Sequence, residues 1–136
     1  MTQELNKVIV QETEAVRTLL LALEEQHRCI LVNDVFGLDA CVSTIKEANK
    51  NIANMEVERR KLTAGRAMLD LIEELKDDEL ENNYYKIKQL LQEVVLQKDA
   101  NELLIKQGLS FTNRILNVLN PVREVATYNA YGKVKK

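Results

Sequence analysis

The sequence predicts an all-α fold: an elongated antiparallel helical bundle of long helices with coiled-coil-like packing and a flexible carboxy-terminal tail. Its 136 residues include four glycines and one proline, too few turn formers for many short strands. Apolar residues also recur every three or four positions over long stretches, the spacing of one helix face. With 46% hydrophobic and 4% aromatic residues, the chain should form a single domain, residues 1–136, with an aliphatic core.

The first helix is expected at residues 1–33, where the apolar residues follow a three-and-four spacing. The next stretch, 33–39, gathers cap and turn residues. Gly37 can adopt a left-handed conformation there, and Asp34 or Asp39 can cap a following helix. A hairpin bend is therefore expected at this point.

The second helix, at 38–62, has a narrow apolar stripe among many charged residues, so we expect it to bury one face. A break should follow, and then a short amphipathic helix at 64–76. Between residues 73 and 81, six acidic residues stand against the single cation of Lys76. We interpret this stretch as a solvated connector.

The last helix is expected at 80–120, about 60 Å long at 1.5 Å per residue, and Pro121 should end it. One stripe alternates steps of three and four, as a coiled-coil seam does: Ile87, Leu90, Val94, Gln97, Asn101, Leu104, Gly108, Phe111, Ile115 and Val118. Further apolar residues lie beside this seam, so the apolar surface is wider than one antiparallel partner can cover. Residues 121–136 lack a helical period and should form a mobile tail.

Composition argues against several classes of function. The net charge is −2 and no basic stripe occurs, so nucleic acid is not an expected partner. The longest apolar run has five residues, Leu19–Leu23, and the first sixteen residues contain three glutamates. We therefore expect neither a signal peptide nor direct membrane insertion, and a cytoplasmic location.

The sequence also lacks the patterns of a metal site or an active site. One histidine, His27, and two cysteines, Cys29 and Cys41, do not make a zinc site at any usual spacing, and we interpret all three as structural, with both thiols free. No glycine-rich phosphate loop, CxxC pair or catalytic constellation occurs. The expectation is a protein that is not an enzyme and uses no cofactor or metal.

Three blocks of the sequence resemble the FlgN family of bacterial flagellar export chaperones. The first block, on the helical hairpin, consists of Glu25, Ile30, Asp34, Leu38, Val42, Lys46, Ile52, Met55 and Arg59/Arg60. The second is similar to the family's Asn-x-x-Leu-Leu stretch and consists of Asn101, Leu104, Ile105, Leu109, Ile115 and Leu119. The third, Tyr128 to Gly132, resembles the family's ending in Tyr, three residues and Gly.

The resemblance implies a cytoplasmic chaperone that binds hook-filament junction (hook-associated) proteins before export. It would hold their oligomerising carboxy-terminal segments, prevent premature oligomerisation and help deliver them to the flagellar export gate. The expected client-binding residues are Leu90, Val94, Asn101, Leu104, Ile105, Leu109, Ile115 and Leu119. Tyr128 and Tyr131 are the expected docking residues for the export gate.

Two alternatives stay open at this point. The same leucines, isoleucines and valines could be plain bundle core, and Asn101 could fix helix register instead of touching a client. The chain could also be a constitutive coiled-coil structural or adaptor protein that homo-oligomerises, whereas a chaperone should be a monomer or a weak homodimer when free.

Overall fold

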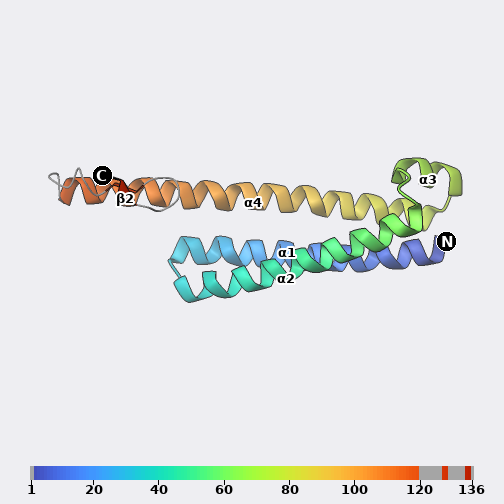
Figure 1. Ribbon diagram of the computed structural model, residues 1–136, viewed down its shortest axis with the longest axis horizontal. Coiled ribbons are helices and arrows are strands. Elements are labelled where there is room, and N and C mark those ends of the chain that lie inside the picture. The colour runs from blue at the N-terminus through green and yellow to red at the C-terminus, as the bar shows by residue number, and fades with distance from the viewer. Residues whose placement is uncertain (1, 120–126, 129–133, 136) are drawn as a thin grey trace. The chain divides into compact units, whose positions relative to one another are not determined.

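The computed structural model describes residues 2–119, 127–128 and 134–135 (Figure 1). The described part contains four helices: α1 (Thr2–Val32), α2 (Val35–Thr63), α3 (Met68–Leu75) and α4 (Asp78–Leu119). The predicted all-α helical bundle is confirmed. The chain divides into two compact units, Met1–Asn101 and Glu102–Lys136, and α4 contributes to both.

The bend between α1 and α2 is built by Asn33 and Asp34. Asn33 has a φ of 57°, which ends α1. The Asp34 carboxylate then accepts a hydrogen bond from the backbone N–H of Gly37 at 2.9 Å, so α2 begins at Val35 and not at residue 38. The expectation that Gly37 could supply the left-handed residue was wrong, because Asn33 takes that conformation. Gly37 instead provides space, since an added Cβ would lie 2.6 Å from the Cys29 Sγ.

Cys29 and Cys41 lie on the two helices near this bend, and both are buried free thiols, as expected. Burial raises the pKa of the Cys29 thiol; Arg28 lowers it in part, and the neighbouring Glu25, Asp34 and Cys41 raise it further. Because the thiolate is the reactive form, both the burial and the raised pKa make Cys29 a poor nucleophile.

The next two breaks also use left-handed residues. Ala64 and Gly65 have φ values of 53° and 77°, so the chain cannot continue as a helix there, and α3 begins at Met68 instead of residue 64. Lys76 has a φ of 49° and ends α3. Asp77 then accepts a hydrogen bond from the backbone N–H of Glu79 at 2.9 Å, which caps α4 two residues earlier than the sequence predicts.

The long helices of the first unit pack in two orientations (Figure 1). α1 and α2 are antiparallel: they are joined by the tight bend, and Arg59 in the second half of α2 meets Glu12 in the first half of α1. α1 and residues 78–101 of α4 are parallel, because Asn83 contacts Asn6 whereas Asn101 contacts Leu23. The unit is therefore an up-down-up arrangement, with α3 leading from α2 into α4.

One aliphatic core joins the four helices of this unit. It consists of Leu5, Ile9, Val16, Leu19, Leu23, Ala48, Met68, Leu71, Ile72, Leu80, Ile87 and Val94. The buried residues of α4 are Leu80, Ile87, Val94 and Asn101, which are seven residues apart and so occupy one heptad position. The seam expected from the sequence therefore packs against the rest of this unit as far as Asn101.

Asn101 is 2% exposed and all four hydrogen-bonding positions of its amide are occupied. Its Nδ2 donates to the Leu23 carbonyl at 2.8 Å and to Gln26 Oε1 at 2.9 Å. Its Oδ1 accepts from Gln97 Nε2 at 3.0 Å and lies 3.0 Å from His27 Nδ1. Because a carbonyl oxygen can only accept, the amide nitrogen must face Leu23, and His27 therefore donates through an Nδ1–H group.

A second buried asparagine lies at the other end of the α1–α4 pair. Asn6 is 6% exposed, donates to Asp77 Oδ2 at 3.4 Å and accepts a hydrogen bond from Asn83 Nδ2 at 3.0 Å. A slip of one helical turn between α1 and α4 would break the contacts of both asparagines. The two side chains therefore fix the register of this parallel pair.

Two short strands are described near the carboxy terminus, β1 (Thr127–Tyr128) and β2 (Val134–Lys135). They pair antiparallel, with Thr127 opposite Lys135 and Tyr128 opposite Val134. The rest of the tail predicted at 121–136 lies outside the described residues.

Asn101→Ala should lower the free energy of unfolding by about 1–3 kcal/mol, because it removes a fully bonded buried amide. Urea denaturation followed by far-ultraviolet circular dichroism measures this change. Asn82→Ala, at an exposed position of the same helix, is the matched control and should change stability little. Equal stability of the two variants would contradict the role of Asn101 in holding α1 against α4.

Candidate functional site

The last part of α4, residues 102–119, carries a dense group of exposed apolar side chains, and we call it the apolar segment. Eight of its side chains are at least 41% exposed: Leu103, Ile105, Leu109, Phe111, Ile115, Leu116, Val118 and Leu119. Single exposed apolar residues are ordinary on protein surfaces, whereas a contiguous group of this size marks an interaction site. The apolar segment is therefore the main candidate site of the chain.

The apolar segment is amphipathic, with an unusually broad apolar face. At 100° per residue, its apolar residues other than Leu103 fall within an arc of about 180°. Leu103 lies on the opposite, polar face with Ser110 and Asn117. A typical amphipathic helix has an apolar stripe of about 100° or somewhat more. This arrangement suits the capture of another amphipathic element.

The structure separates the eight predicted client-binding residues into two groups. Five lie in the apolar segment, where Leu104 is half-buried and the exposed ones are Ile105, Leu109, Ile115 and Leu119. The other three lie in the first unit: Val94 belongs to the core, Leu90 packs against it and Asn101 is buried. A client could reach Val94 and Asn101 only if the packing of residues 2–101 opened, whereas Leu90 is half-buried.

The two predicted docking tyrosines fall near the carboxy terminus. Tyr128 belongs to β1, and its backbone pairs with Val134 of β2. Tyr131 lies outside the described residues.

An exposed apolar group at the α1–α2 bend was not anticipated from the sequence. Leu31, Val32, Val35 and Phe36 are between 58% and 90% exposed. The only signal in the sequence is that apolar pairs flank Asn33 and Asp34 on both sides, where the helical period is interrupted.

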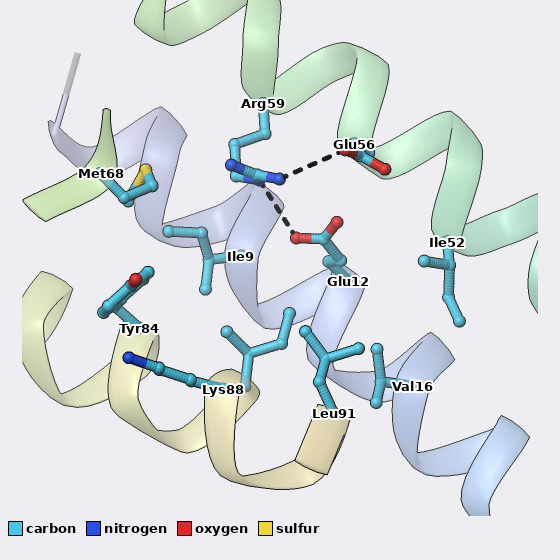
Figure 2. A pocket seen from close by; sticks show the side chains of 11 residues that line it. Ile9, Glu12, Val16, Ile52, Glu56, Arg59, Met68, Tyr84, Lys88 and Leu91 are labelled. Atoms are coloured by element: carbon cyan, nitrogen blue, oxygen red, sulfur yellow. Dashed lines mark ion pairs between the residues drawn. The ribbon is translucent and has the colours of Figure 1, made fainter. Parts of the chain in front are cut away.

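A cavity of about 260 Å³ opens between α1, α2 and the first part of α4, and the sequence did not indicate it either (Figure 2). Its walls are mostly apolar. The polar side chains of Glu12, Glu56 and Arg59 come from α1 and α2, and those of Tyr84 and Lys88 come from α4 on the other side. The lining residues are Ile9, Glu12, Val16, Ile52, Glu56, Arg59, Met68, Tyr84, Ile87, Lys88 and Leu91.

The polar side of this cavity is an ion-pair group between α1 and α2. Figure 2 shows Arg59 reaching between Glu56 of its own helix and Glu12 of α1. Arg59 Nε lies 3.3 Å from Glu12 Oε1, and the Glu12 side chain is 8% exposed. Burial raises the pKa of the Glu12 carboxyl and Glu56 raises it further, while Arg59 lowers it only in part.

The chemistry available in this cavity is that of a structural ion pair. Glu12 faces an arginine, which holds its proton at any ordinary pH and so does not serve as a proton-transfer partner. Among the described residues, no group of three or more His, Cys, Asp or Glu side chains is placed to hold a metal ion. No described helix has the length and apolar character needed to span a bilayer.

The burial of the Glu12 carboxylate should make the stability difference between the wild type and Glu12→Gln depend on pH. Because the pKa of Glu12 is raised in the folded state, the folded chain takes up a proton at higher pH than the unfolded chain does. The wild type should therefore gain stability relative to Glu12→Gln as the pH falls from about 7 to about 5. Urea denaturation of both proteins at each pH measures the difference, in which the contributions of other carboxylates cancel. The raised pKa would be contradicted if the stability difference stayed constant, or if Glu12→Gln gained stability relative to the wild type, as the pH falls.

Comparison with known proteins agrees with the exposed apolar face. The model of the FlgN protein family matches residues 1–136, the whole chain. No curated protein matches the chain, and no solved structure matches it. FlgN proteins are flagellar export chaperones, and as a family they bind hook-associated proteins. Because the family model matches its full length, the chain belongs to the FlgN family of flagellar export chaperones.

Proposed function

We propose that this chaperone binds the carboxy-terminal amphipathic segments of hook-filament junction proteins in the cytoplasm, prevents their premature oligomerisation and helps deliver them to the export gate. The observation that carries the proposal is the apolar segment, which presents eight apolar side chains at least 41% exposed. Family membership supports the class of client, because FlgN proteins bind hook-associated proteins.

The recognition mode follows from the surface. A client segment that oligomerises through an apolar stripe would lay this stripe on the apolar segment and bury both surfaces. Each buried apolar Å² contributes roughly 25 cal/mol, which provides the driving force for capture. While the stripe is covered, it is not available to another client molecule. The apolar segment would therefore act as a temporary substitute for the client's own assembly partner.

We assign this role to Leu104, Ile105, Leu109, Ile115 and Leu119. Leu90, Val94 and Asn101 pack within residues 2–101. We propose that they stabilise the helix that carries the binding surface. A role of Val94 or Asn101 in direct client contact would require the first unit to open.

Delivery is a separate step, and we assign it to Tyr128 and Tyr131. An aromatic side chain is an effective docking anchor, because it buries a large area at a low cost in conformational entropy. A site near the carboxy terminus would let the loaded chaperone dock on the gate while the client stays on the helix.

A homo-oligomeric adaptor is the alternative, because a second copy could also cover the apolar segment. Light scattering on the free protein separates the two functions. A chaperone should be a monomer or a weak dimer, whereas an adaptor should form a tight oligomer at low micromolar concentration.

Replacing Leu109 and Ile115 by serine in one variant should weaken client binding at least about tenfold, because two apolar anchors are lost. Isothermal titration calorimetry with a full-length hook-filament junction protein from the same organism measures the affinity. The control replaces Leu21 and Val57 by serine; these residues of α1 and α2 are 60% and 51% exposed. Equal affinity losses in the two folded variants would remove the case for the apolar segment.

Tyr128→Ala should leave client affinity unchanged and reduce secretion of junction proteins, because we place Tyr128 in docking and not in client capture. The measurements are secretion by cells that carry the variant and client binding by the purified protein. Tyr85→Ala, at a 51% exposed tyrosine of α4, is the control and should secrete normally. Normal secretion by Tyr128→Ala, or a defect fully explained by lost client binding, would show that Tyr128 has no separate role.

A further inference from the structure

The apolar face of α4 widens after Asn101. Before it, the buried residues of α4 follow a single heptad line, and the positions beside this line hold both charged residues, Lys88 and Lys98, and exposed apolar residues, Leu91 and Val95. In the apolar segment, the heptad positions of the two lysines are occupied by Leu109 and Ile105. Charged side chains therefore interrupt the broad face before Asn101 and do not interrupt it after Leu103.

Two apolar ridges can be distinguished on this face by helical phase. The first continues the seam and consists of Leu104, Phe111, Ile115 and Val118. The second lies beside it and consists of Ile105, Leu109 and Leu116. Apart from Leu104, which is half-buried, every one of these side chains is at least 41% exposed, so the second ridge is as available as the first.

The line between the two ridges is shallow as far as Leu119, which lies on it at the end of the helix. Gly108 lies there, and a Cβ added to it would meet nothing within 4 Å. Thr112 follows it, and its hydroxyl donates to the Gly108 carbonyl at 2.9 Å. Because this hydroxyl is already bonded within the helix, an apolar partner can cover the line without leaving a polar group unpaired.

A cation lies beyond the outer edge of each ridge. Arg114 lies beyond the first ridge and Lys106 beyond the second. Within the described part of the chain, neither side chain has an ion pair. A partner with acidic residues along both outer edges would complement this arrangement.

We propose that the apolar segment holds two helical segments of one client side by side, one on each ridge, and so completes a three-helix bundle. Each client helix carries acidic residues on its outer edge, facing Arg114 on one side and Lys106 on the other. This inference rests on the proposed function and specifies how the client is bound. One helix would cover about 100° of an arc of about 180°, and the remaining ridge would stay in water.

Three single variants at nearly equal exposure test the proposal. Phe111→Ser removes an anchor from the first ridge and Leu109→Ser one from the second, while Leu103→Ser on the opposite face is the matched control. The three residues are 60%, 61% and 57% exposed, so none of the changes disturbs a packed core. Circular dichroism verifies that the helix content is retained, and calorimetry with the full-length junction protein measures affinity.

Both ridge variants should lose at least about tenfold in affinity, and the control less than about threefold. If only Phe111→Ser weakens binding, one client helix uses the seam alone; the two-helix proposal is then wrong and the proposed function stands. If neither ridge variant differs from the control, the apolar segment is not the client site, and both proposals fall.

The isolated carboxy-terminal peptide of the same junction protein distinguishes two helices from one broad contact. Taken alone, the peptide should occupy a single ridge, so at most one of the two ridge variants should change its affinity. If the peptide binds one-to-one and each ridge variant weakens it about tenfold, a single helix spans both ridges and the proposal is overturned.

Discussion

The parallel pairing of α1 with residues 78–101 of α4 depends on buried amides at its two ends. Asn6 contacts Asp77 and Asn83, and Asn101 is fully bonded against α1. Aliphatic side chains alone tolerate a slip of one helical turn, because one leucine or valine can replace another in a seam. A slipped asparagine would instead leave polar groups buried without partners. This penalty selects the register in which Leu80, Ile87 and Val94 enter the core.

With this register, the two parts of α4 have different roles. The residues on its heptad line up to Asn101 stabilise the bundle, and the apolar residues after Asn101 are not needed for the fold of residues 2–101. Stability and the proposed partner binding therefore depend on different parts of one helix. This separation allows the binding surface to vary in sequence without unfolding the unit that carries it.

The helices could be predicted because their apolar spacing is regular over many turns. The ends of the helices in the structure differ from the predicted ends by one to four residues. These ends depend on which of several cap residues is used: Asp34 caps through the Gly37 N–H, and Asn33 takes the left-handed conformation. The broad apolar face was visible in the sequence, but the division at Asn101 was not, because α1 covers one part of the seam through tertiary contacts. The Glu12–Arg59 pair was equally hidden, since it joins residues of two helices with no local signal.

Residues 105–119 are exposed at every position, so this part of α4 gains no buried surface from the described fold. Isolated helices of about 12–15 residues are marginal in water, and a glycine such as Gly108 costs about 1 kcal/mol relative to alanine. A partner can bind only while these turns are helical. The observed dissociation constant therefore equals the intrinsic constant divided by the fraction of time for which they are helical. Helix–coil relaxation of such a stretch takes about 0.1–1 μs. If clients bind here as proposed, their affinity depends on the helicity of this stretch as well as on the contacts that it makes.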